Sequence, residues 1–328
     1  MKKFINNPKD LVPELLEGFA LAFPGKVRLT GGHTIVRATP KEAGKVRLVT
    51  LGGSGHEPGL SGFVGMGMLD VSVAGEIFAA PGAVRCIEAI QNACAGGESA
   101  LLVVLNHAGD VLAANIAMQA IEHEHRDVKI VFTQEDISSP VGDRRGLVGS
   151  LAVYKVAGAA AERGDSLDAC FATAERMERN MRTLAVAVRT ATHPSTGQPI
   201  FDLGEDEMEI GMGQHGETGI GRMPLKTANE TAEIMLQKLL EDLNVREGEQ
   251  LLVLLNGAGA TTLMELYIVF RRVAQILESK KVRLVRSAIG EFITTQEQAG
   301  FQMMIARMDS ELIELWDAPA DAPFFIKL

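Results

Sequence analysis

The sequence predicts an α/β protein with two α/β domains, each holding a mostly parallel or mixed sheet flanked by helices. Short runs rich in valine and leucine alternate with stretches of helical period, and this alternation favours a largely parallel sheet. Several of the short runs end in glycine-rich turns, which punctuate strands and helices. A length of 328 residues with only 5% aromatic residues fits two domains built on small aliphatic side chains.

The predicted N-terminal domain covers residues 1–183. Its helices are expected where apolar residues recur at helical spacing, at 8–22, 111–122, 147–163 and 166–183. Its strands are expected in β-branched or leucine-rich runs bounded by turn residues, at 45–51, 100–105 and 128–132. A loop is expected at 133–146. The first two strands lead directly into polar, glycine-containing loops.

The predicted C-terminal domain covers residues 184–328. Its strands are expected at 184–189, 250–255, 282–289 and 300–308, and its helices at 227–243 and 265–280. Residues 103–109 and 254–259 share a strand-to-loop pattern, which we interpret as a common arrangement rather than evidence of duplication. Such loops place their residues at the carboxyl ends of strands, where open α/β sheets usually carry their sites.

Charge and composition exclude several classes of protein. A net charge of -10 argues against a nucleic-acid-binding surface. Lys2 and Lys3 precede no apolar run, so we expect neither a signal peptide nor a membrane segment. The three cysteines, Cys86, Cys94 and Cys170, lack metal-ligand spacing and are typical of reduced core thiols, so we expect a cytoplasmic protein.

The segment from Glu209 to Gly221 is the most informative of the chain. It sets His215 among five glycines, with carboxylates on both sides and no helical or strand period. Glycine in such a loop serves unusual φ angles or the close approach of another molecule. His215 is therefore a candidate base or nucleophile. The alternative is a surface turn with an idle histidine.

A second glycine-rich loop, Gly52 to Pro58, follows the predicted strand at 45–51. It fits neither the Walker spacing nor G-x-G-x-x-G, so a nucleotide site is weakly supported. The turn can present backbone N–H groups and the His56 ring to a small polar ligand. It can equally be a tight turn with a buried polar histidine.

Asp110 ends the loop that begins at Asn106 and stands before a predicted helix. It is a good candidate for the N-cap of that helix. The functional alternative is a carboxylate at the carboxyl end of a strand that removes a proton from a substrate hydroxyl. His107 is expected to be a neighbour of the site. No pair of histidines has zinc spacing, so no metal is expected on this chain.

Taken together, these segments resemble the substrate-binding subunit of the dihydroxyacetone kinase family, the DhaK type. The resemblance spans essentially the whole chain and is specific as a set. The matching segments are 45–58, 75–78, 106–110, 158–169, 211–217, 259–261, 265–267 and 315–319.

The resemblance implies a covalent mode of substrate capture. A ring nitrogen of the histidine at the position of His215 adds to the carbonyl of a short ketose and forms a hemiaminal. The aspartate matching Asp110 acts as general base on the terminal hydroxyl. The histidine matching His56 hydrogen-bonds the substrate, and the backbone of Gly53 is expected to contact it as well. Holding one hydroxyl in line with a phosphate is the main task in such transfers.

The resemblance also implies the partners. The family subunit binds no nucleotide itself, whereas a separate helical subunit (DhaL type) carries ADP or ATP with Mg²⁺ and delivers the phosphoryl group. That subunit is recharged by a phosphoenolpyruvate-dependent relay, or ATP is used directly. Family members are homodimers. The expected partners are thus a small ketose, the helical nucleotide-binding subunit and a second copy of the chain, with no nucleic acid and no membrane.

Three positions depart from the family pattern. The loop usually written Lys-Asn-Tyr-Thr-Gly-Asp has Leu105 in place of the lysine and His107 in place of the tyrosine, and the Ser of a frequent Ser-Pro is Ala80. Losing polar partners changes which hydroxyls a buried pocket can satisfy. We therefore expect a related triose or tetrose, such as an erythrulose, rather than dihydroxyacetone.

Two other functions stay open at this point. A non-catalytic ketose sensor that binds a transcription regulator exists in the family, but such relatives tend to lose the aspartate that Asp110 retains. A nucleotide-binding oxidoreductase is disfavoured because the chain lacks a dinucleotide fingerprint.

Overall fold

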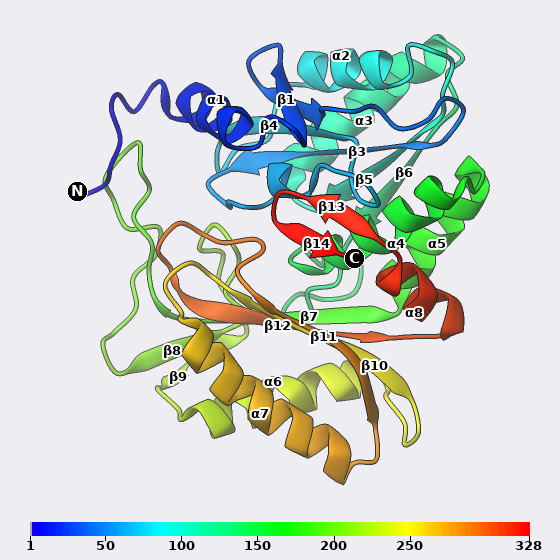
Figure 1. Cartoon of the computed structure of the whole chain (residues 1–328). Coiled ribbons are helices and arrows are strands. Elements are labelled where there is room, and N and C mark those ends of the chain that lie inside the picture. The colour runs from blue at the N-terminus through cyan, green and yellow to red at the C-terminus, as the bar shows by residue number, and fades with distance from the viewer. Residues whose placement is uncertain (1) are drawn as a thin grey trace. The chain divides into compact units, whose positions relative to one another are not determined.

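The computed structural model describes residues 2–328, and these divide into two compact units (Figure 1). Unit 1 comprises the chain up to Thr133, Ser150–Met177 and Glu314–Leu328, and unit 2 comprises Gln134–Gly149 and Glu178–Ile313. Met1, which the predicted N-terminal domain includes, lies outside the described residues. The predicted domain boundary at residue 184 stays a prediction. The two compact units are groups of residues that lie close together in space, and they do not by themselves define domains.

Unit 1 contains a six-stranded sheet in the order β1-β2-β4-β3-β5-β6. Its strands are β1 (Val27–Thr30), β2 (Thr34–Arg37), β3 (Arg47–Ser54), β4 (Val71–Ile77), β5 (Ala100–Leu105) and β6 (Val128–Thr133). Strand β3 runs parallel to β4 and β5, and β5 runs parallel to β6. The β1–β2 hairpin adds an antiparallel edge. The loops after β3 and β5 therefore leave the sheet at the same edge.

Helices cover both faces of this sheet. They are α1 (Leu11–Ala22), the short 3₁₀ helix η1 (Ser61–Phe63), α2 (Ala83–Ala93), α3 (Ala108–His123), α4 (Gly149–Arg163) and α5 (Leu167–Arg179). Alternate residues of a strand point to opposite faces. Leu51 and Val73 accordingly join the buried cluster with α2 and α3, whereas Gly52 and Ser72 face a cavity that α1 lines.

The chain's last segment returns to complete unit 1. It consists of α8 (Ser310–Asp317) and a hairpin of β13 (Ala320–Ala322) and β14 (Phe325–Lys327). Met66 forms a β-bridge with Asp321, and the Lys26 ammonium pairs with the same aspartate. The ring of Phe324 lies 5.6 Å from that of Phe23 of the first helical region.

Unit 2 contains a second six-stranded sheet in the order β11-β10-β12-β7-β8-β9. Its strands are β7 (Met181–Arg189), β8 (Glu207–Ile210), β9 (Gly221–Pro224), β10 (Gln250–Gly257), β11 (Arg283–Gly290) and β12 (Ala299–Arg307). Only β10 and β11 pair in parallel among these strands. Helices α6 (Ala228–Asp242) and α7 (Leu263–Ser279) share one buried core with the sheet, and capping boxes at Thr227 and Thr262 fix where they begin.

The predicted α/β class with flanked sheets is confirmed, and two boundaries are corrected. The helix predicted at 166–183 ends at Arg179, because residues 181–183 join β7 and pair with β12. The helix predicted from 111 begins at Ala108. Among residues 2–328, no helix combines the length and the apolar character that crossing a bilayer requires.

Candidate functional site

Three of the predicted site residues lie in unit 1, at the carboxyl ends of neighbouring strands. Gly53 is near the end of β3, His56 follows that strand, and Asp110 lies in the first turn of α3, which follows β5. Strands β3 and β5 pair in parallel, so their following loops are close in space. His56 is 5% exposed and Asp110 is 8% exposed, so both residues are almost fully buried but keep a small area in contact with solvent.

The segment Phe78–Ala80 contacts both parts of the chain that carry these residues, the end of β3 with the loop after it and the start of α3. The rings of Phe78 and His56 lie 5.2 Å apart between centroids. A Cβ placed on Gly53 would lie 2.8 Å from the Ala79 nitrogen, and one on Gly109 would lie 3.1 Å from the Ala80 Cβ. Glycine at 53 is therefore required by backbone packing, and unit 1 gathers its three candidates around one short segment.

The structure corrects the capping interpretation of Asp110. The residue at the N-cap of α3 is His107, and Asp110 is the third residue of the helix. A carboxylate in the first turn of a helix is favoured by the partial positive charge of the free backbone N–H groups. Asp110 thus lies where an ionised carboxylate is stabilised without being the residue that begins the helix.

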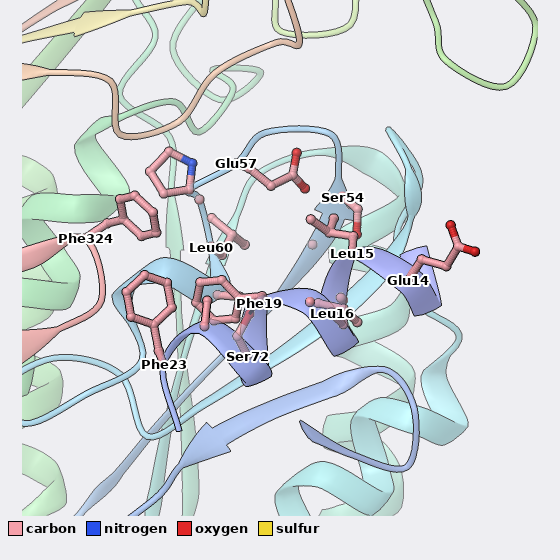
Figure 2. A pocket seen from close by; sticks show the side chains of 18 residues that line it. Glu14, Leu15, Leu16, Phe19, Phe23, Ser54, Glu57, Leu60, Ser72 and Phe324 are labelled. Atoms are coloured by element: carbon pink, nitrogen blue, oxygen red, sulfur yellow. Dashed lines mark hydrogen bonds between the residues drawn. The ribbon is translucent and has the colours of Figure 1, made fainter. Parts of the chain in front are cut away.

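The glycine-rich segment after β3 also lines a cavity of about 520 Å³ in unit 1 (Figure 2). Helix α1 supplies Phe19 and the segment after it Phe23, and these rings group with Phe324. Leu16 and Leu60 extend the apolar wall. A polyol needs hydrogen-bond partners for its hydroxyls. Ser54, Glu57 and Ser72 also line this cavity, but neither His56 nor Asp110 does.

His215 lies in unit 2, in the loop that joins β8 to β9. Residues 211–220 form turns and irregular backbone, as the absence of a period predicted. A Cβ at Gly213 would lie 2.1 Å from Glu217 Oε2, and Gly216 has a φ of 85°. The glycines permit this backbone path, and the path presents the His215 side chain, 27% of which is exposed.

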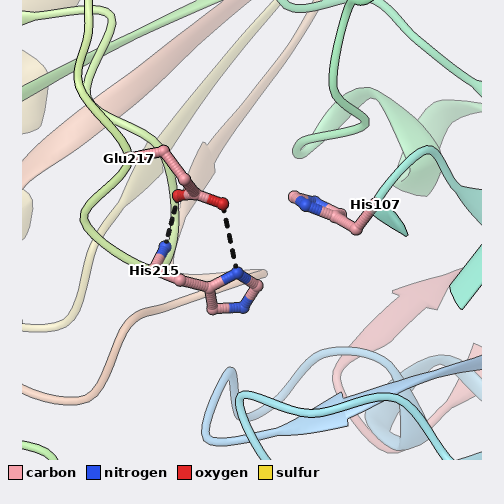
Figure 3. Close-up of side chains that lie close together, drawn as sticks. All are labelled: His107, His215 and Glu217. Atoms are coloured by element: carbon pink, nitrogen blue, oxygen red, sulfur yellow. Dashed lines mark hydrogen bonds and ion pairs between the residues drawn. The ribbon is translucent and has the colours of Figure 1, made fainter. Parts of the chain in front are cut away.

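Glu217 holds His215 at two points (Figure 3). Its Oε2 accepts the backbone N–H of His215 at 2.9 Å, and its Oε1 lies 3.4 Å from ring Nδ1. Burial by itself would raise the pKa of the Glu217 carboxyl, but the hydrogen bonds that it accepts from His215 outweigh burial and lower it. The ionised carboxylate therefore orients the imidazole ring through its Nδ1 atom.

Arg145 ties this loop to the segment 134–149. Its Nε donates to Asp136 at 2.9 Å, and its Nη2 donates to Ser138 at 2.6 Å and to the Gly211 carbonyl at 2.9 Å. Its Nη1 lies 3.9 Å from Glu217 Oε2. Burial raises the pKa of Asp136, although the Arg145 charge opposes this. The Arg145 guanidinium therefore contacts both the start of the loop and the carboxylate that orients His215.

The Dak1 domain model matches residues 17–324. The chain belongs to the Dak1 family. The resemblance to DhaK-type subunits is confirmed, because this family model covers most of the chain and relatives of that type align along its full length.

Two relatives and one solved structure show what this Dak1 chain is similar to. An L-erythrulose kinase of Pectobacterium atrosepticum is 38% identical over 335 aligned positions, covering 100% of this chain and 56% of the relative. The dihydroxyacetone-binding subunit DhaK of PTS-dependent dihydroxyacetone kinase 2 of Listeria innocua is 35% identical, covering 99% of both chains. The structure of the dihydroxyacetone kinase operon co-activator Dha-DhaQ has a TM-score of 0.91 at 28% identity, covering 96% of this chain and 98% of the co-activator.

The Dak1 chain thus spans about half the length of the L-erythrulose kinase and the full length of the DhaK subunit. Its curated relatives include kinases and subunits of kinases. The sequence singles out the histidines and Asp110 as candidates, but it does not single out Arg145. The signal was weak, since Asp143-Arg144-Arg145 is a polar run in a loop with no period. Gly53, His56 and Asp110 share unit 1, whereas His215 belongs to unit 2.

Proposed function

We propose that this chain is the substrate-binding subunit of a dihydroxyacetone-type kinase and captures a short-chain ketose on His215. The observation that carries the proposal is the His215 ring, presented by a glycine-rich loop and held through Nδ1 by an ionised Glu217, in a chain of the Dak1 family. A histidine oriented through one nitrogen is a nucleophile at the other.

The capture step conserves every proton. Nε2 of a neutral His215 ring bonds to the ketone carbon, and the carbonyl π electrons pass to oxygen. The ring gains positive charge, which the Glu217 carboxylate stabilises while Nδ1 gives up its proton. The oxygen takes up one proton, and the product is a neutral hemiaminal. An alcohol without a carbonyl cannot react in this way, so capture selects ketoses over polyols such as glycerol.

The unit 1 residues then serve the transfer. Asp110 accepts the proton of the terminal hydroxyl as that oxygen attacks phosphorus. His56 donates a hydrogen bond to the captured sugar, and the Gly53 backbone contacts it. A helical nucleotide-bearing subunit of the DhaL type holds ADP or ATP with Mg²⁺ and supplies the phosphoryl group. We further propose that the subunit works as a homodimer.

The preferred sugar in this proposal is a tetrulose. Leu105 and His107 remove the family's lysine and tyrosine, and Leu105 is buried at the end of β5. The similarity to an L-erythrulose kinase supports the same choice. A turnover assay should give a higher kcat/KM for erythrulose than for dihydroxyacetone. A clear preference for dihydroxyacetone would refute this assignment.

Intact-mass measurement with a small ketose tests the capture step. The native chain should gain the mass of one sugar, His215→Ala should gain none, and the loop variant His193→Ala should behave as the native chain. Asp110→Asn should keep the adduct while phosphoryl transfer slows by about 10²-fold or more, the usual scale for a general base. An adduct on His215→Ala, or full turnover by Asp110→Asn, would contradict the proposal.

A second candidate function is a ketose sensor that binds a transcription regulator. The similarity to a solved operon co-activator favours it. Both functions predict the adduct on His215, but only the kinase subunit forms sugar phosphate when the nucleotide-bearing subunit is supplied. An adduct without any sugar phosphate under those conditions would favour the sensor.

A further inference from the structure

A second cavity of unit 1, about 440 Å³ in volume, lies away from every predicted site residue. The β1–β2 hairpin, the start of β3 and helix α2 form its walls. Arg47, the first residue of β3, lines it, whereas Gly53 and His56 lie at or beyond the other end of the same strand. The cavity is therefore at the amino edge of the parallel strands.

The charge of this cavity is opposite to that of the chain. Its lining includes five lysine and arginine side chains against three carboxylates, an excess of two positive charges in a chain of net charge -10. The basic residues are Arg28, Arg37, Lys41, Arg47 and Arg85, and the acidic ones are Asp70, Glu88 and Glu98. A concave surface of one sign concentrates ligands of the other sign.

Part of this charge is already neutralised within unit 1. Asp70 accepts from Arg37 at 3.1 Å and from Lys41 at 2.7 Å. Arg47 Nη2 donates to Glu98 at 2.8 Å. Arg85, on the face of α2 that lines the cavity, has no side-chain hydrogen bond or ion pair among residues 2–328. Its charge is available to a ligand.

Arg47 has a buried donor nitrogen that its ion pair leaves without an acceptor, which a purely structural ion pair would not have. Its side chain is 9% exposed, and its Nη1 has no hydrogen-bond partner within residues 2–328. Nδ1 of His33, another lining residue, is also buried without a partner in the same part of the chain. A buried charged donor without an acceptor is costly. An anion in the cavity would remove that cost.

We propose that this cavity binds a small organic phosphate, with Arg47 and Arg85 as the side chains that hold the phosphate group. Guanidinium groups match phosphate oxygens through paired N–H donors. The lining also includes the apolar side chains of Val36, Val71 and Ala89, which suit a carbon skeleton rather than a bare ion. The volume falls in the usual range for small-molecule sites, about 300–1,000 Å³.

Calorimetric titration of the full chain at low ionic strength tests the proposal, with glycerol 3-phosphate, glucose 6-phosphate, inorganic phosphate and succinate as probes. At least one organic phosphate should bind more tightly than inorganic phosphate and succinate. Arg85→Gln should weaken that binding about tenfold, the effect of losing about 1.4 kcal/mol. Arg283→Gln, which removes an exposed arginine of unit 2, should leave it unchanged. The same titration on His215→Ala should give the native affinity, because the cavity does not involve the ketose site.

Three outcomes would overturn the proposal. They are the absence of organic phosphate binding at millimolar concentration, equal binding by Arg85→Gln and the native chain, and binding of inorganic phosphate as tightly as the organic probes. Loss of binding in His215→Ala would assign the ligand to the ketose site instead. Arg47→Lys keeps the charge but removes the forked donor, so it should weaken binding even where Arg47→Gln proves unstable.

Discussion

The Glu217 carboxylate contacts both the ring and the backbone of His215, and Arg145 lies beside it. The sequence shows which residue types are present in this arrangement, but it does not show which of them lie in contact. A histidine with a carboxylate two positions later is visible in the printed chain. That the two side chains meet depends on the turn that Gly216 allows with its positive φ, and such loop geometry has no periodic pattern from which to predict it.

At the residue scale, Glu217→Gln should weaken ketose capture about tenfold, because a neutral amide stabilises the developing imidazolium less than a carboxylate does. The backbone bond from His215 can persist, since the amide oxygen still accepts. Native mass spectrometry over a range of ketose concentrations would give the apparent Kd. Glu205→Gln, an exposed acid earlier in the same unit, serves as the control. Equal affinity of Glu217→Gln and the native chain would remove Glu217 from the capture step.

At the element scale, the local patterns predicted most of the long elements but missed helix α2, strand β4 and the short strands. The predicted strand at 100–105 coincides with β5, and the helices at 8–22 and 227–243 correspond to α1 and α6. Strands β1 and β2 have four residues each, which is too short for alternation to be distinctive. The antiparallel pairings of β12 with β7 and with β10 join segments far apart in sequence, so no local pattern could reveal them.

The helix α4 begins beside a carboxyl group that burial keeps protonated. Oε1 of Glu135 accepts the backbone N–H groups of Leu147 and Gly149 at 2.8 and 2.9 Å. Burial raises the pKa of Glu135 to about 8, although these two hydrogen bonds oppose the rise. In the unfolded chain the same group titrates near 4.5. Between these values the native state holds a proton that the unfolded state has lost, so stability falls as pH rises.

Glu135→Gln should therefore flatten the pH dependence of stability. The native chain should lose a few kcal/mol of unfolding free energy, on the order expected from the pKa difference, between pH 5 and pH 8. The variant keeps an acceptor for the two N–H groups and should be the more stable protein at pH 8. Urea unfolding at both pH values measures this, with the exposed Glu278→Gln as control. A parallel decline in the variant and the native chain would show that Glu135 does not titrate in this range.

At the scale of the whole molecule, unit 1 is assembled from three separate stretches of chain. Its last stretch packs against glycines that leave room for backbone. A Cβ on Gly67 would lie 2.2 Å from the carbonyl oxygen of Pro319, and one on Gly65 would lie 2.3 Å from that of Asp321. The sequence predicts no such contact, because the segments are separated by about 250 residues and share no local pattern.

Gly67→Ala should destabilise the protein by about 1–3 kcal/mol, because the methyl group overlaps the returning backbone. Gly44→Ala is the matched control. Both glycines have positive φ, 70° and 80°, but Gly44 has open space around its Cβ position. The control therefore measures backbone strain alone, about 1 kcal/mol. Chemical unfolding measures the loss of stability in both variants. Equal losses would mean that residues 314–328 move away from the added methyl group without any loss of unfolding free energy.

The three-stretch construction of unit 1 has a consequence for how the chain matures on the ribosome. Residues 134–313, which contain all of unit 2, emerge before the stretch 314–328 that closes unit 1. Translation adds about 5–20 residues each second, and a domain folds once all of it is outside the exit tunnel. Unit 1, whose first stretch is synthesised before unit 2, is therefore the unit that completes its folding last. Until then its Gly65 and Gly67 surface stays uncovered, within reach of chaperones or of a neighbouring nascent chain.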